Sequence, residues 1–230
     1  MITNKDAIYQ IKDLFHKDQI SSDNTESDRW IFREILKYRS SLISQKFKQK
    51  DFLNTLLYQE ICVKLVETNK NECLCNVPDD CSVYVSDILL PKSIIPYDFV
   101  SNTDNSVQYS RIDTKTARFK TNTRYTYLNN KSAFYTLDQG LGDHLYIVSK
   151  NPLLTNAKVK TIFENPLEAQ MYPDCEGVIP FPCRSAYDYE FKTDQALFTT
   201  IKQLIIRDYG NLIMQGPLDN VHDNRNNPTE

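Results

Sequence analysis

Glycine is scarce in this sequence, at 5 of 230 residues. Gly-rich loops that wrap phosphate groups need several glycines where the backbone approaches the phosphates, and no such loop is present in the sequence. Tight turns must therefore rely on asparagine and aspartate, which tolerate left-handed backbone conformations better than most residues. The scarcity of glycine argues against a phosphate-binding enzyme.

The sequence also lacks a long apolar run and an excess of basic residues. No run approaches the roughly 18 apolar residues that a membrane-spanning helix needs. Lys and Arg number 27 against 30 Asp and Glu, giving a net charge of -3, whereas a duplex-binding surface needs a marked basic excess. Residues 1–20 have no signal-peptide pattern, so we expect synthesis in the cytoplasm and reduced cysteines.

The first 50 residues carry the periodicity of amphipathic helices. Asn4–Phe15 places Ile8, Ile11 and Phe15 on one face, with charged residues around the rest. This spacing predicts a short opening helix.

A second, longer helix is predicted from Trp30 to about Lys48, where apolar residues recur every three or four positions. Ser27 or Asp28 can cap its first turn. Its other face is basic, with Arg33, Lys37, Arg39, Lys46 and Lys48. That face, together with Lys50, could contact DNA phosphates, but we favour solvent or a subunit contact because the whole chain is acidic.

Residues 51–165 are predicted to form a β-rich domain. Leu57, Ile61, Val63 and Leu65 alternate with polar residues, as in a half-buried strand. Asn129-Asn130 fits a two-residue hairpin turn. The other predicted strands are Ser82–Leu90, Ser106–Ile112, Arg118–Leu128, Ser132–Leu137, His144–Ser149 and Val159–Phe163.

The C-terminal part divides into three predicted segments. Residues 166–192 form a Pro-rich connector, which we expect to be extended. Residues 193–216 form a helix that Thr193 or Asp194 can cap and that Gly216-Pro217 ends. Residues 217–230 form a flexible tail with little to bury. The four prolines between Glu164 and Ala186 are Pro166, Pro173, Pro180 and Pro182.

This order of elements predicts an α+β fold rather than alternating strands and helices. The N-terminal helices at 1–50 and the C-terminal helix at 193–216 are expected to form a helical bundle. The central domain at 51–165 is expected to be an antiparallel β-rich unit.

The six cysteines are the first candidates for metal binding, because thiolates are good zinc ligands. They are Cys62, Cys73, Cys75, Cys81, Cys175 and Cys183. A single residue separates Cys73 from Cys75, whereas zinc sites usually pair cysteines about two to four residues apart, and no histidine lies nearby. We therefore predict no metal site and no cofactor.

His144 follows Asp143, which suggests a general base with its orienting carboxylate. Adjacent residues on a strand point to opposite faces, so this pair is not expected to work together. His16 and His222 lie far away in sequence with no nucleophile beside them. We predict no catalytic residue.

Two acidic clusters and the many tyrosines have simpler explanations. Asp79-Asp80 and Asp219–Asp223 lack the spacing of a calcium loop and are predicted to be solvated turns. The 14 tyrosines suit either protein interfaces or packing in a β-rich domain.

Several motifs recur in the order found in a known family. They are Ser27-Asp28-Arg29-Trp30-Ile31, Lys37-Tyr38-Arg39-Ser40-Ser41-Leu42-Ile43, the run from Cys73 to Tyr84, Ile162-Phe163-Glu164-Asn165-Pro166-Leu167-Glu168, Pro182-Cys183 and Ile201-Lys202-Gln203-Leu204-Ile205. Together they resemble the head-to-tail connector proteins of crAss-like podoviruses, from about Ile8 to Leu212.

The resemblance implies a structural virion protein of the neck or tail, made in the cytoplasm of a bacterial host. It implies a twelve-copy ring that docks to the portal protein, contacts other neck or tail rings and extends the channel through which packaged DNA passes. No membrane partner is implied. The alternative is a non-virion phage or host protein-binding module of the same fold.

Overall fold

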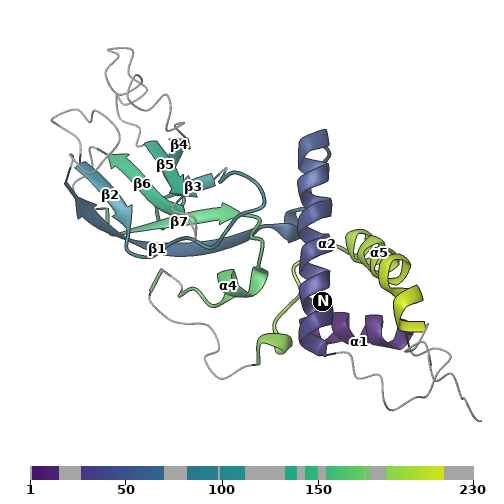
Figure 1. Cartoon of the computed structure of the whole chain (residues 1–230). Helices are drawn as coiled ribbons and strands as arrows, with labels where there is room; N and C mark the ends of the chain where they lie inside the picture. The colour runs from purple at the N-terminus through teal and green to yellow at the C-terminus, as the bar shows by residue number, and fades with distance from the viewer. Residues whose placement is uncertain are drawn as a thin grey trace, which may run out of the picture.

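The computed structural model separates three long helices from a β-barrel, which lie side by side in Figure 1. It describes residues 2–15, 27–69, 82–97, 99–111, 133–138, 143–149, 154–173, 175–176 and 185–214. The three helices come from both ends of the described chain, and the strands come from its middle. The predicted mixed class, with helices and strands in separate regions, is confirmed.

Helices α1 (Asn4–Phe15) and α2 (Asp28–Gln49) begin and end close to their predicted bounds. The hydroxyl of Ser27 accepts a hydrogen bond from the Trp30 N–H at 3.2 Å, so Ser27 caps α2. Such a cap satisfies one of the N–H groups that the first helical turn leaves without an intrahelical partner.

Helix α5 (Gln195–Met214) is the predicted C-terminal helix. The Asp194 carboxylate accepts a hydrogen bond from the Leu197 N–H at 2.7 Å. Of the two predicted caps, Asp194 is therefore the one that satisfies the first turn, and its charge also suits the helix N-terminus.

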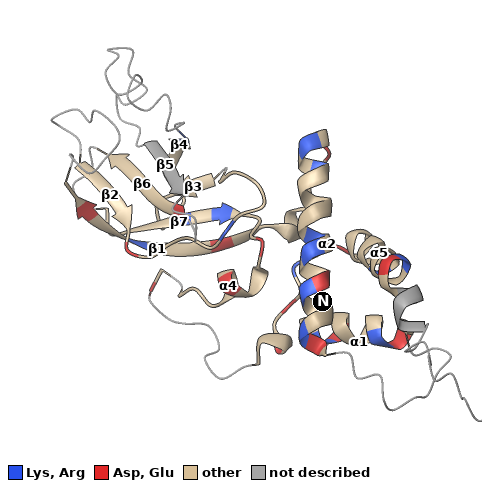
Figure 2. Cartoon of the chain, viewed as in Figure 1, with Lys and Arg blue, Asp and Glu red and all other residues tan. Residues whose placement is uncertain are grey.

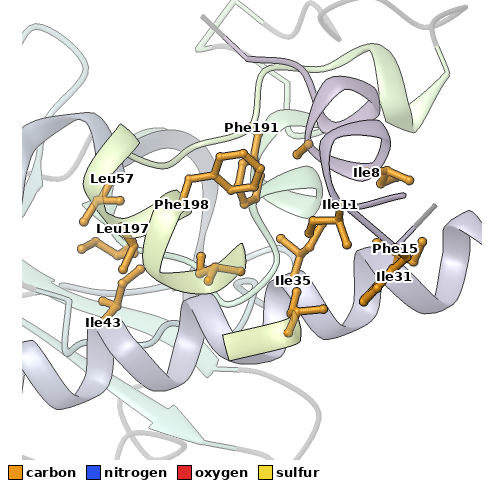
Figure 3. Close-up of a cluster of buried hydrophobic side chains, with 14 of the residues drawn as sticks. Ile8, Ile11, Phe15, Ile31, Ile35, Ile43, Leu57, Phe191, Leu197 and Phe198 are labelled. Carbon is orange, nitrogen blue, oxygen red and sulfur yellow. The ribbon is translucent and has the colours of Figure 1, made fainter. Parts of the chain in front are cut away.

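The apolar faces of α1, α2 and α5 meet in one hydrophobic cluster, which we call the helical core (Figure 3). The predicted residues of α1 are all buried in it, and Ile162, which follows the last strand, joins the same cluster. The other buried members are Ala7, Ile31, Ile35, Ile43, Leu57, Ile95, Phe191, Leu197, Phe198, Ile201 and Ile205. The core therefore links both ends of the chain to the edge of the barrel.

Seven strands close into a barrel in the order β1-β2-β6-β5-β4-β3-β7, and β7 pairs back with β1. All neighbouring pairs are antiparallel except β4 and β5, which run parallel. The strands are β1 (Gln59–Thr68), β2 (Ser82–Ser86), β3 (Phe99–Ser101), β4 (Gln108–Arg111), β5 (Ala133–Asp138), β6 (Asp143–Ser149) and β7 (Asn156–Thr161).

Strand β1 closes the barrel because its two halves pair with different strands. Residues 59–64 pair with β7, and residues 65–68 pair with β2. Ile61, Val63 and Leu65 belong to a second hydrophobic cluster inside the barrel, as the alternation of side chains along a strand predicts.

Several predicted strand bounds are corrected by the structure. Leu57 lies in the short 3-10 helix η1 (Thr55–Leu57) instead of in β1, and β3 was not predicted. The turn before β4 places Asn105 at a φ of 61°, as expected for a chain that builds turns from asparagine. The predicted strand Arg118–Leu128 and the Asn129-Asn130 turn lie outside the described residues.

The predicted extended connector is wrong at its start, where helix α4 (Pro166–Gln170) forms. The Asn165 side chain accepts a hydrogen bond from the Leu167 N–H at 3.2 Å and caps this helix. Pro166 fits the first helical position because its missing N–H would have no intrahelical partner there. Further along, Ala186–Asp188 forms the 3-10 helix η3.

Arg39 does not belong to the exposed basic face of α2, contrary to the sequence prediction. Its side chain is 0% exposed, whereas that of Arg33 on the same helix is 72% exposed. The Arg39 Nε donates a hydrogen bond to the Lys192 carbonyl, and Nη1 donates one to the Phe163 carbonyl, both at 2.9 Å. One guanidinium thus joins α2 to the end of β7 and to the segment before α5.

Burial lowers the pKa of Arg39 to about 10, because removing the guanidinium from water disfavours its charged form. Within the described residues Arg39 makes no ion pair, and its polar contacts are these two hydrogen bonds to carbonyls. Hydrogen bonds to a charged donor are stronger than neutral ones and offset part of the desolvation cost.

Replacing Arg39 by alanine should lower the free energy of unfolding by about 2–5 kcal/mol, because the variant leaves a cavity and deprives two carbonyls of their donor. Urea denaturation measures this change. Arg33→Ala is the matched control on the exposed face and should change stability by no more than about 0.5 kcal/mol. Similar small effects for both variants would contradict a joining role for Arg39.

Candidate interaction surfaces

The remaining basic residues of α2 are distributed along its length (Figure 2), and all are exposed except Lys46, which is partly buried. The Lys37 ammonium donates a hydrogen bond to Glu34 Oε2 at 3.1 Å, which raises the pKa of Lys37. At the C-terminal end of the helix, Lys48 and Lys50 are exposed and make no ion pair with the described part of the chain. The basic charge available to a partner is therefore concentrated at that end.

Two tyrosines join α2 to α5. The Tyr38 hydroxyl donates to Asp208 Oδ2 at 2.6 Å, and the Tyr209 hydroxyl donates to Glu34 Oε2 at 2.9 Å. Tyr209 also packs edge-on against Trp30, with ring centroids 5.1 Å apart. Burial and the bond to Asp208 raise the pKa of Tyr38. These tyrosines thus contribute to packing within the chain.

His144 is hydrogen-bonded to a serine, a pairing that the sequence analysis missed. Its Nδ1 lies 3.2 Å from Ser86 Oγ, which also accepts the Leu145 N–H at 3.1 Å. Ser86 is 1% exposed, so a substrate has no access to its hydroxyl.

The negative charge of Asp143 acts on a different residue, Tyr97. Burial first, and then the charge of Asp143, raise the pKa of Tyr97. Asp143 and His144 therefore act on different partners, as expected for neighbours on a strand. The contact between Ser86 and His144 joins β2 to β6, and we interpret it as structural.

Cys62 and Cys175 form a disulfide, with Cα atoms 5.1 Å apart, so the expectation of reduced thiols is wrong for this pair. Cys62 lies between the inward-facing Ile61 and Val63, and its side chain therefore points to the outer face of β1. The segment after α4 lies over this face (Figure 1) and brings Cys175 to it. Cys73, Cys75, Cys81 and Cys183 lie outside the described residues.

Within the described ranges, no group of three or more His, Cys, Asp or Glu residues could hold a metal ion. None of the described helices is long and apolar enough to cross a membrane. The other residues considered for metal or catalytic chemistry lie outside those ranges and are His16, Asp79, Asp80, Asp219–Asp223 and His222.

Grooves flank α4 on two sides. One has a volume of about 990 Å³ and is lined by the Cys62–Cys175 disulfide together with charged residues of β1 and of the segment before α5. The other, of about 690 Å³, lies between the Ile88–Lys92 segment and α4, and is largely apolar. A third hollow, of about 610 Å³, is formed by the C-terminal end of α2 and the turn that follows it.

Large apolar side chains are exposed beside two of these grooves. Phe52 is 83% exposed and Leu56 is 57% exposed beside the end of α2, and Ile88 (46%) and Met171 (50%) flank the 690 Å³ groove. Apolar residues that cluster on a surface commonly mark a protein contact. Their exposure could not be predicted from the sequence, because they lie in turns, where no periodicity distinguishes inward from outward positions.

The sequence profile of the family described as phage tail ring protein 2 matches residues 6–229. No curated protein matches the chain.

The Cys62–Cys175 bond should stabilise the fold by about 2–5 kcal/mol, because it closes a loop across a sequence separation of 113 residues. Adding a reductant should lower the melting temperature of the wild-type chain. The Cys175→Ser variant should melt at the temperature of the reduced protein and should not respond to reductant. A wild-type melting curve that does not change on reduction would contradict a stabilising role for this disulfide.

Proposed function

The chain belongs to the phage tail ring protein 2 family of crAss-like phages, and on this basis we propose that it is a head-to-tail connector subunit of the virion. In this role, copies of the chain form a ring that docks to the portal protein and extends the DNA channel toward the tail. The observation that carries the proposal is the family match over residues 6–229.

The form of the chain supports a ring. A closed ring needs a heterologous interface, in which two different surfaces of each subunit meet. The helical core and the barrel are two parts of the chain that meet at Arg39 and at Ile162, and each has its own exposed surface. No pocket chemistry is needed for such a role, and we propose that the chain is not an enzyme.

We also propose the positions of its parts in the ring. In this proposal each predicted segment has its own role. The segments are 1–50, 51–165, 166–192, 193–216 and 217–230. The helices of the first and fourth segments form the bundle nearest the channel. DNA passes without sequence-specific binding, and the net charge of -3 suits a wall that does not retain the phosphate backbone.

The runner-up function is a non-virion phage or host protein-binding module. The exposed apolar residues beside the grooves favour a binding role in either case. A small enzyme acting through His144 is disfavoured because the hydrogen-bonded Ser86 is buried. The location of the protein in the phage particle separates the connector from the binding module.

Mass spectrometry of purified virions should detect the protein at a fixed, low copy number, consistent with twelve copies per particle. Negative-stain images of the purified protein, alone or with the portal protein, should show rings. Absence of the protein from virions that contain the portal and other tail proteins would contradict the connector role and favour the binding module.

Deleting Leu218–Glu230 should leave folding intact but impair assembly onto the portal. The deleted residues are mostly Asn, Asp and Pro, which have little apolar surface to contribute to a core. Circular dichroism and thermal melting check the fold, and co-sedimentation with the portal protein checks assembly. A variant with the same tail composition in scrambled order is the matched control. Normal assembly of the truncated chain would exclude a docking role for the tail.

A further inference from the structure

The C-terminal end of α2 presents an apolar surface with basic residues beside it, which we call the α2 tip. Phe47, Phe52 and Leu56 are 38%, 83% and 57% exposed, and they lie within ten residues of one another. Lys48, Lys50 and Asp51 are exposed between Phe47 and Phe52, which leaves this surface with a net positive charge. Single exposed apolar residues are common on soluble proteins, but Phe47 and Phe52 line one hollow, and such a cluster indicates a contact surface.

Lys50 occupies a backbone position that glycine would fill at lower cost. It ends α2 in the left-handed conformation, with a φ of 60°. The Lys50 N–H bonds to the Phe47 carbonyl at 3.1 Å, and the Asp51 N–H bonds to the Lys46 carbonyl at 3.0 Å. This is the helix ending in which glycine is the usual residue, because a Cβ is unfavourable there. The lysine therefore places an exposed cation at the end of the helix at a cost in backbone energy.

We call the groove of about 690 Å³ beside α4 the α4 groove. It is largely apolar and has acidic residues at its rim, so it complements the apolar and basic α2 tip. Exposed Ile88 and Met171 flank it, and its volume is in the range of roughly 300–1,000 Å³ that suits insertion of a ligand-sized group. Lys92 pairs with Glu164 at 3.2 Å, and exposed Glu168 then leaves the rim with a net negative charge. Figure 2 shows this contrast, with blue at the end of α2 and red on α4.

We propose that the α2 tip of one copy docks into the α4 groove of the next copy in the ring. Phe52 would enter the apolar floor of the groove, and Lys50 would face Glu168. The C-terminal end of α2 and helix α4 lie apart on one chain (Figure 1), so the pairing joins different copies head to tail. The inference rests on the proposed ring and names the surfaces that build it.

Charge reversal on each surface tests this pairing. Lys50→Glu and Glu168→Lys each place like charges opposite one another and should weaken self-association roughly tenfold or more. Lys64→Glu and Glu67→Lys are matched controls, because both residues are exposed on β1 and carry the same charge changes. Sedimentation velocity over a concentration series measures association, and thermal melting checks that each variant is folded.

Mixing the two single variants tests the contact between Lys50 and Glu168 directly. The reversed tip of Lys50→Glu matches the reversed groove of Glu168→Lys, and the unaltered tip and groove match each other. The mixture should therefore assemble into alternating rings at concentrations at which neither variant assembles alone. Lys50→Gly should raise the melting temperature, because it relieves the left-handed cap, while weakening association.

The results of these experiments distinguish failure of the proposed pairing from failure of the proposed connector function. If wild type forms rings and the reversed variants form them equally well, the pairing is wrong and the connector role stands. The same holds if the variants lose only portal binding, since the groove would then accept another protein. A wild-type chain that stays monomeric at every concentration contradicts the pairing, and its presence in virions then decides the connector role separately.

Discussion

The buried guanidinium of Arg39 is the contact on which the arrangement of the whole chain depends. It lies on α2, yet its two hydrogen bonds go to the Phe163 carbonyl at the end of β7 and to the Lys192 carbonyl before α5. Three parts of the chain that are distant in sequence therefore meet at one charged group. Because a buried charge is costly unless it is hydrogen-bonded, this group holds its partners in a defined geometry. The helical core and the barrel are thereby fixed relative to each other.

A fixed orientation of the helical core relative to the barrel matters for a ring, because the angle between the two contact surfaces of a subunit decides whether the ring closes. The α2 tip belongs to the helical side of the chain and the α4 groove belongs to the barrel side. The Cys62–Cys175 bond fastens the segment after α4 to β1, so the groove is also held against the barrel. These covalent and polar contacts set the spacing between the two surfaces, and in the proposed ring the exposed apolar residues would form the contact between subunits.

Features that repeat along the chain were predictable from the sequence, and features that depend on distant partners were not. The bounds of α1, α2 and α5 follow from apolar periodicity and capping residues, and β1 follows from alternation. The burial of Arg39 depends on carbonyls 124 and 153 residues away, so helix periodicity alone placed it on the wrong face. The disulfide likewise joins two cysteines that are 113 residues apart in sequence. Closure of the barrel requires β1 to pair with β7 along one half and with β2 along the other. Helix α4 did have a local signal, because an asparagine followed by proline fits a helix start.

The central claim is that copies of this chain form a ring in which the α2 tip of each subunit meets the α4 groove of its neighbour. A cryo-electron microscopy map of the neck of purified virions tests this most directly. The map should show a closed ring in which Phe52 of one copy lies against Met171 of the next, with Lys50 facing Glu168 across the interface. A ring whose copies meet through other surfaces, with the α2 tip in solvent, would contradict it.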